Sequence, residues 1–313
     1  MPAPIRAVFM GNDAWSVPPL ERLVAQDAVD VVLVVTNPPR PAGRGSRLTP
    51  TPVADAARRW SLPLEEAETT RDERFVAALR AAEPDVSVVV AYGELLLRDA
   101  LDAPRHGSIN LHFSLLPRWR GASPVQHAIL EGDAVTGVTV IQMDEGMDTG
   151  PVYARREEAL RPDDDAGTLG IRLAAIGAAA VADVLPGLVD GSVRVTPQEG
   201  TATLAPKLGP ADRVVDWTGS AEAVARRVRA FAPDPGATTT FRGKDLKLLG
   251  AEAIGGPGGT PGTVVDVDRA GVVVTAGDGT VRLLEVAAPG RRRMSAADWA
   301  RGVRDLTGDR LGT

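Results

Sequence analysis

The sequence predicts an α/β protein: a doubly wound, mostly parallel sheet followed by a smaller β-barrel domain. Three observations predict this class. Short apolar runs alternate with helical segments in the first half, a Pro/Gly-rich segment follows, and short strands broken by Gly, Asp and Pro make up most of the rest. At 313 residues the chain is also long enough for two domains.

The first half reads as strands alternating with helices. Its apolar runs are typical of parallel strands buried on both faces, and they are Ile5–Phe9, Val31–Val35, Val86–Ala91 and Val138–Met143. Helical segments are expected between them at Pro18–Gln26, Val53–Trp60 and Arg71–Ala82. Asp163–Thr168 supplies capping residues for a long Ala/Leu helix, which should end near Leu185–Gly187. The alternation indicates a Rossmann-like sheet.

The second half begins after a segment that lacks periodicity. Residues 190–208 are rich in Gly and Pro and are predicted to link a domain at 1–189 to one at 209–313. Ala221–Phe231 is expected to be a helix. Short strands should follow, with a hairpin turn at Ala276–Gly279, and they are Thr263–Val267, Val272–Thr275 and Val281–Val286. A helix with short strands favours an OB-like barrel.

The composition of the chain excludes several kinds of site and several classes of protein. The chain has no cysteine, which excludes disulfides, thiol nucleophiles and thiolate metal sites, and with three histidines no metal is expected. We find no apolar run that predicts a membrane span and no signal-peptide pattern, so a cytoplasmic protein is expected. The net charge is −6, but residues 207–313 hold 16 basic and 13 acidic residues. This asymmetry favours a polyanion facing the second half, although chance could also produce it.

Two motifs carry candidate chemistry. Asn110 and His112 lie two apart in a strand-like run, so their side chains should share a face. Asp148 lies in the following loop, 143–151. An amide, an imidazole and a carboxylate suit acyl transfer to an amine, because they can stabilise an oxyanion and move a proton. Taken singly, each has a plainer reading as a capping residue, a structural histidine or a turn residue.

These motifs resemble a known family. N-x-H-x-S-L-L-P-x-x-R-G at 110–121, followed by D-x-G-x-D-T-G at 144–150, is similar to the signature of folate-dependent formyltransferases, and most similar to the branch that acts on methionyl-tRNA. The resemblance implies transfer of the formyl group of 10-formyltetrahydrofolate to the amino group of methionyl initiator tRNA. It also implies that Asn110, His112 and Asp148 are catalytic, without a covalent acyl-enzyme and without a metal.

The resemblance also implies a folate pocket. Ser114, Leu115, Leu116 and Pro117 match the family's folate contact, and Tyr92 lies in a second loop that should complete the pocket. A plain strand-to-helix connection is the alternative for that second loop. The first strand ends without G-x-G-x-x-G, and no P-loop is present, so NAD and ATP are not implied. Two departures from the family are Gly11-Asn12-Asp13, where Gly-Thr-Pro is frequent, and the bulky Phe113.

A loop at 37–52 is a candidate tRNA contact. Proline and glycine argue against regular structure there, and Arg40, Arg44 and Arg47 add positive charge. The loop resembles the insertion by which the tRNA-specific branch engages the acceptor arm, with Arg44 as its central arginine. An ordinary solvated loop is the alternative. Basic residues of the second half could form a cationic face, and they are Lys207, Arg226, Arg227, Arg229, Arg242, Lys244, Lys247 and Arg291 to Arg293.

Three other functions compete with this interpretation. The same donor could serve another amine, such as a nucleotide-sugar amine or glycinamide ribonucleotide, but the arginine loop argues against it. A hydrolase would deformylate the folate with water and would not need the second domain. A non-enzymatic tRNA-binding module would leave the Asn110, His112 and Asp148 set unexplained. The resemblance further implies a monomer.

Overall fold

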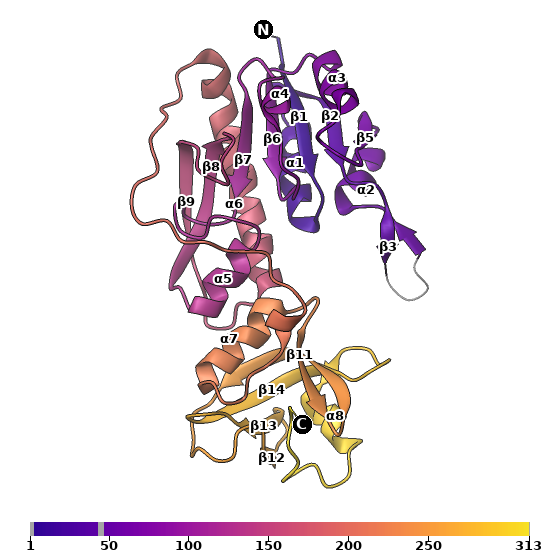
Figure 1. Cartoon of the computed structure of the whole chain (residues 1–313), viewed down its shortest axis with the longest axis vertical. Coiled ribbons are helices and arrows are strands. Elements are labelled where there is room, and N and C mark those ends of the chain that lie inside the picture. Colours follow the sequence, from indigo (N-terminus) through magenta and orange to yellow (C-terminus); the bar gives the residue numbers. More distant parts are fainter. Residues whose placement is uncertain (1–2, 43–46, 313) are drawn as a thin grey trace. The chain divides into compact units, whose positions relative to one another are not determined.

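The computed structural model describes residues 3–42 and 47–312. The chain divides into two compact units (Figure 1). The first comprises Met1–Pro124, Val135–Ala159 and Gly170–Pro206, and the second comprises Val125–Ala134, Leu160–Leu169 and Lys207–Thr313.

A seven-stranded sheet forms the centre of the first unit. Its strands run in the order β5-β2-β1-β6-β7-β8-β9, with bounds β1 Ile5–Gly11, β2 Val29–Thr36, β5 Leu64–Glu66, β6 Val86–Val90, β7 Ser108–His112, β8 Val135–Gln142 and β9 Val152–Ala159. The five strands from β5 to β7 are parallel, which confirms the predicted doubly wound, mostly parallel sheet. The expectation for Val138–Met143 was wrong in direction, because β8 pairs antiparallel with both β7 and β9. Burial on both faces makes a strand apolar whichever way it runs.

Helices of the first unit lie close to their predicted positions. They are η1 Ala14–Ser16, α1 Val17–Val24, α2 Pro52–Arg59, α3 Glu73–Ala81, α4 Arg98–Leu101, α5 Pro124–Glu131 and α6 Ala166–Asp190, the last two shared with the second unit. Thr51 and Asp72 cap α2 and α3 by accepting hydrogen bonds from the backbone N–H groups of Ala54 and Phe75. These caps explain why α2 and α3 begin where they do.

Helix α6 is longer than the sequence predicts. It continues through Pro186 to Asp190 instead of ending near residues 185–187. Leu185 and Leu188 are buried, so packing offsets the backbone hydrogen bond that the proline cannot donate. A Cβ added at Gly177 would clash with the side chain of Leu111 in β7. The helix therefore packs closely on the sheet at this point. By length and composition α6 could cross a membrane, contrary to the expectation from sequence, but 61% of its apolar stretch is buried inside the protein.

The second unit is an antiparallel sheet with helices. Its elements are η2 Ala211–Arg213, α7 Ala221–Phe231, β10 Ala237–Phe241, β11 Lys244–Ala253, β12 Val264–Val267, β13 Val272–Thr275, β14 Thr280–Ala287, β15 Met294–Ser295 and α8 Ala296–Arg301. The strand order is β10-β11-β14-β13-β12, with β15 paired to β14. The predicted helix and the three predicted strands are confirmed. β10, which holds three Thr, and β11, which holds two Lys and one Gly, were not predicted.

The end of the chain joins both edges of this sheet. Leu311 forms a bridge to Phe241 in β10, and Arg310 forms one to Thr263, just before β12. Strand pairing therefore continues from one edge strand to the other through residues 310–311. This pairing gives the antiparallel second domain its barrel-like closure, as the sequence predicts.

Two segments expected to be irregular are ordered. Within 37–52, β3 (Arg40–Ala42) pairs with β4 (Arg47–Thr49), and this hairpin extends beyond α2 (Figure 1). The expectation of no regular structure was therefore wrong. An isolated two-stranded ribbon tolerates Pro41, because each strand has an unpaired edge where a missing N–H costs little. The 190–208 segment also lies along the first unit, where Thr196 pairs with Val152 and Leu204 with Arg120.

Candidate active site

Strand β7 places Asn110 and His112 side by side. In register, Asn110 lies between Val89 of β6 and Ile141 of β8, and His112 lies opposite Thr139. Because residues two apart on a strand point to one face, both polar side chains emerge on the same side of the sheet. His112 is buried and Asn110 is half-buried. An imidazole and an amide therefore lie together where two parallel strands and one antiparallel strand meet.

Asp148 approaches both side chains from the loop between β8 and β9. Its Oδ1 accepts a hydrogen bond of 3.1 Å from Asn110 Nδ2, and its Oδ2 accepts one of 2.8 Å from the Gly121 backbone N–H. Oδ2 also lies 3.6 Å from Nδ1 of His112. The structure thus brings together the three residues that the sequence singles out as catalytic.

The ring of His112 has a defined orientation. Its Nε2 lies 2.8 Å from the carbonyl oxygen of Trp119. A carbonyl only accepts, so Nε2 carries the hydrogen and donates it. Nδ1 therefore has a lone pair in the neutral ring, and it faces the Asp148 carboxylate. Protonation at Nδ1 would turn this contact into an ion pair inside a buried site.

The Ser114–Pro117 turn has a rigid backbone framework. Ser114 Oγ donates to the carbonyl of Arg118 at 2.6 Å. The Thr139 hydroxyl donates to the Ser114 carbonyl at 2.6 Å and accepts from the Leu116 N–H at 3.1 Å. Ser114, Leu116 and Pro117 are buried, while Leu115 is half-buried and lies against Gly137. Thr139, which the sequence did not single out, therefore fixes this turn to β8.

Tyr92, which the sequence predicts to complete a folate pocket, is buried. Its ring is buried in an apolar cluster with Met10 and Leu101, and its hydroxyl has no hydrogen-bond partner. Burial, and then the negative charge of Glu94, raise the pKa of Tyr92 to about 12. Its carbonyl accepts a hydrogen bond from the amide of Asn12. Through this bond the backbone of the Tyr92 loop contacts the residue that follows β1.

Asn12 joins three strand ends. Its Nδ2 donates to Tyr92 after β6, and its Oδ1 accepts from Thr36 Oγ1 at 2.9 Å and from the Asn37 N–H at 2.8 Å after β2. Asn12 itself follows β1. The departure from Gly-Thr-Pro at this position therefore has a structural role that the motif comparison did not predict. It anchors the start of the segment that carries the β3–β4 hairpin.

Gln198 was also missed by sequence reasoning. It belongs to the 190–208 segment, yet its side chain contacts the loops on both sides of the candidate site. Its Nε2 donates to the carbonyls of Asp148 and Gly150, both at 2.8 Å. Its Oε1 accepts from Nε and Nη2 of Arg120, at 3.1 and 2.7 Å. A single glutamine between a proline and a glutamate offered no signal of this role.

The predicted tRNA-binding arginines lie only partly within the described residues. Arg40 and Arg47 are exposed on opposite strands of the β3–β4 hairpin. Arg44 lies outside the described residues. No group of three or more His, Cys, Asp or Glu side chains that could hold a metal ion occurs within residues 3–42 and 47–312.

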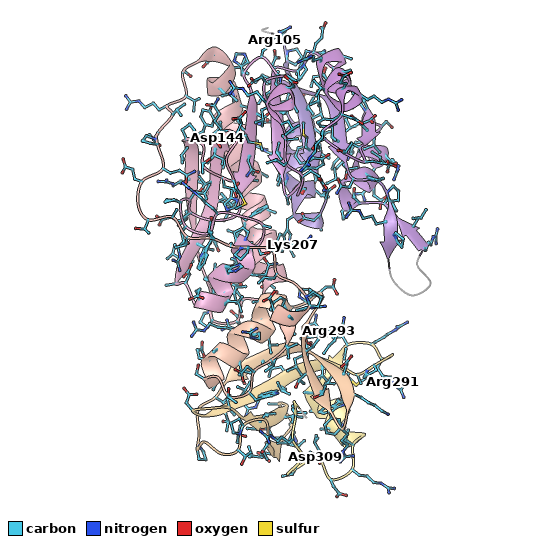
Figure 2. All side chains as sticks on the ribbon, in the orientation of Figure 1. Arg105, Asp144, Lys207, Arg291, Arg293 and Asp309 are labelled. Carbon is cyan, nitrogen blue, oxygen red and sulfur yellow. The ribbon has the colours of Figure 1, made fainter. Side chains whose placement is uncertain are left out.

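The basic residues of the second unit differ in exposure. Figure 2 labels Lys207, Arg291 and Arg293, which are exposed, as are Lys244 and Lys247. Arg229 is half-buried: it donates to the carbonyl of Pro162 and lies 3.7 Å from Glu222, and burial lowers its pKa. Arg242 pairs with Asp309 at 2.7 Å and stacks on Phe241. The candidate cationic face is therefore smaller than the sequence count suggests.

Family comparisons define the class of protein. Residues 6–185 match the family model described as formyl transferase, and residues 207–304 match the model described as formyl transferase, C-terminal domain. Together the two matches cover most of the chain. The two matches define the chain as a formyl transferase with the family's C-terminal domain.

Curated relatives narrow the class. Methionyl-tRNA formyltransferase of Streptomyces coelicolor is 46% identical over 310 residues, covering 98% of this chain and all of the relative. The enzyme of the same name from Thermus thermophilus is 46% identical over 308 residues, covering 98% and 99%. The chain belongs to the formyl transferase family, and within it to the methionyl-tRNA formyltransferases.

Solved structures share the fold at low sequence identity. HypX from Aquifex aeolicus, solved with tetrahydrofolic acid, superposes with a TM-score of 0.69 at 19% identity, over 97% of this chain and 48% of that one. An N-formyltransferase from Helicobacter canadensis, solved with folinic acid and dTDP-3-aminofucose, gives 0.64 at 14% identity, over 89% and 98%. Methionyl-tRNA formyltransferase from Clostridium thermocellum gives 0.57 at 15% identity, over 80% and 94%.

Proposed function

We propose that this chain transfers the formyl group of 10-formyltetrahydrofolate to the free amino group of methionyl initiator tRNA, giving N-formylmethionyl-tRNA for translation initiation. The contact of Asp148 with both Asn110 and His112 carries the proposal, because it assembles the groups that amine formylation needs. Near-full-length identity of 46% to methionyl-tRNA formyltransferases supports the acceptor.

Asn110 stabilises the developing oxyanion in this scheme. Its amide has two N–H donors, and one of them is bonded to Asp148. The second can donate to the formyl oxygen as the amine nitrogen bonds to the formyl carbon and negative charge develops on that oxygen. Because Asp148 fixes the amide in advance, little reorganisation is needed during the reaction.

His112 carries the proton between the two nitrogens. The neutral ring presents its Nδ1 lone pair, since Nε2 donates to Trp119. Nδ1 takes a proton from the attacking amine, and the imidazolium is stabilised by Asp148 at 3.6 Å. The same proton then passes to the leaving nitrogen of the folate as its bond to the formyl carbon breaks. No covalent bond to the protein forms, and the ring ends neutral.

The folate lies against the Ser114–Pro117 turn in this proposal. Leu115, Leu116 and Pro117 supply an apolar wall, while Ser114 keeps the turn in shape through its bond to Arg118. Tyr92 contributes through the backbone of its loop, because its ring is buried in the core. Folate is the co-substrate, and no metal takes part in the scheme.

Arginines select the acceptor. Arg40, Arg44 and Arg47 contact tRNA phosphates from the hairpin segment, and exposed lysines of the second domain add further contacts. We further propose that the protein acts in the cytoplasm as a monomer. Its proposed working parts are a catalytic domain at 1–189, a linker at 190–208 and a tRNA-positioning domain at 209–313.

The decisive experiment measures formyl transfer from 10-formyltetrahydrofolate to methionyl initiator tRNA. Uncharged tRNA and a reaction without tRNA are the controls. Formylated aminoacyl-tRNA, formed only with the charged substrate, is the expected product. Release of tetrahydrofolate without tRNA would instead indicate a hydrolase. Binding of tRNA without turnover of the folate would indicate a binding module.

A further inference from the structure

We propose that Gln198 is a positioning residue for formyl transfer: it locks the Asp148 loop against the loop after β7, and so fixes the carboxylate on which Asn110 and His112 depend. The inference rests on the proposed function and deepens it. Gln198 lies in the 190–208 segment, outside the motifs that identify the family. Gln198 itself need not touch a substrate to act in this way.

Both the nitrogen and the oxygen of the Gln198 side-chain amide form hydrogen bonds. Its nitrogen donates to the carbonyls of Asp148 and Gly150, and its oxygen accepts from two nitrogens of Arg120. A guanidinium only donates and a carbonyl only accepts, so the reverse orientation of the amide would lose all four bonds. The side chain therefore recognises both loops with one defined geometry.

The two loops that Gln198 joins also make the hydrogen bonds that hold His112 and Asp148. Arg120 lies between Trp119, whose carbonyl accepts from His112, and Gly121, whose N–H donates to Asp148. On the other side, Gln198 binds the backbone of Asp148 itself. A shift of either loop would change the 3.6 Å separation of His112 Nδ1 and Asp148 Oδ2. Misplacement by about 1 Å can cost a reaction about 10²-fold in rate.

The Asp148 backbone needs such support. Its φ is +55°, a left-handed conformation that is unfavourable for most residues with a side chain. Two residues on, Gly150 packs so closely that an added Cβ would clash with the Gln142 carbonyl oxygen. Bonds from one amide to the carbonyls of both residues hold this turn in the conformation that presents the carboxylate.

The test compares three variants of the full-length protein. Gln198→Glu keeps the shape but places a carboxylate oxygen against two carbonyl oxygens. Gln198→Ala removes the contacts without adding charge. Glu199→Gln is the matched control, since Glu199 is the exposed neighbour in the same segment. The measurements are kcat and the KM for each substrate from pH 5 to 8, with the thermal midpoint as a check of folding.

A positioning role predicts a specific pattern. In Gln198→Glu and Gln198→Ala, kcat falls by at least about 10-fold while both KM values stay within about twofold, because geometry rather than binding is lost. The loss in Gln198→Glu shrinks as pH falls, since the protonated carboxyl regains a donor, whereas the loss in Gln198→Ala does not. Glu199→Gln behaves as the wild type.

Other outcomes overturn the inference. A kcat within twofold of the wild type in both Gln198 variants would show that the loops hold their positions without this residue. A rise in KM alone would show a binding role instead. If the wild type itself formylates no tRNA, the proposed function is wrong, and the inference that rests on it is wrong too. This outcome is distinct from the other two, because it is seen in the wild type and not only in the Gln198 variants.

Discussion

At the residue scale, the negative charge of Asp148 matters more for the proposed reaction than the hydrogen bonds that its carboxylate accepts. Both carboxylate oxygens accept from neutral donors, Asn110 and Gly121, and an amide oxygen could accept part of this pattern. Only the carboxylate, however, stabilises an imidazolium at His112. A neutral replacement should therefore preserve much of the structure and lose the chemistry.

We expect Asp148→Asn to lower the single-turnover rate of formyl transfer by about 10²–10⁴-fold, the range typical of general acid–base groups, with little change in KM. His112→Ala should fall in the same range. Rapid-quench measurement of formylated tRNA checks both. If either variant stayed within a few-fold of the wild type, the proton path through His112 would be wrong.

Tyr92 gives a prediction about stability. Its hydroxyl is buried without a partner, so Tyr92→Phe removes a polar group that costs free energy to bury, about 1–3 kcal/mol for an unsatisfied group. The variant should be as stable as the wild type or more stable, measured by denaturant unfolding. A clear loss of stability would mean that the hydroxyl has a partner in solution.

The same residue predicts how stability depends on high pH. The pKa of Tyr92 is raised to about 12, so the fold favours the neutral phenol. Stability from this group is complete below the ordinary pKa of 10.0 and is lost as pH rises from there through about 12. Unfolding free energies of the wild type should fall over this window, and those of Tyr92→Phe should fall less. Parallel curves would contradict the burial of the ring.

At the element scale, sequence predicted what depends on local pattern. The helix at 221–231 and the strands within 5–11, 29–36 and 86–90 follow from apolar periodicity. The direction of β8 and the length of α6 depend on packing partners, which are distant in sequence. For the same reason the sequence singled out Asn110, His112 and Asp148, which lie in motifs, but not Gln198, whose side chain bonds to residues 48 to 78 positions away.

The conformation of the turn between β8 and β9 can be tested by substituting Gly150. A Cβ at Gly150 would meet the Gln142 carbonyl, a backbone atom that cannot move without disturbing β8. We expect Gly150→Ala to lower the thermal midpoint by several degrees and kcat by at least about 10-fold, because the turn presents Asp148. Gly258→Ala is the control, since an added Cβ there meets nothing within 4 Å. Equal behaviour of the two variants would argue against a rigid turn.

At the scale of the whole molecule, charge is divided between the two halves. The net charge is −6, yet the residues from 207 onward carry an excess of positive charge. Lys244 and Lys247 are exposed on β11, and Arg40 and Arg47 are exposed on the hairpin of the first unit. Folate is small and is held by its own pocket in our proposal, whereas tRNA offers phosphates to many cations. Raising the ionic strength should therefore weaken the binding of tRNA much more than the binding of the folate.

We expect KM for methionyl-tRNA to rise steeply with salt, while KM for 10-formyltetrahydrofolate changes little. Replacing Lys247 or Arg47 by Ala should raise KM for tRNA at low salt and reduce the log–log salt slope by about 1 for each phosphate that the variant no longer neutralises. Arg22→Ala, an exposed cation on α1, is the control. Unchanged slopes in both variants would show that neither side chain binds phosphate, and the acceptor would then have to be recognised by other surfaces of the protein.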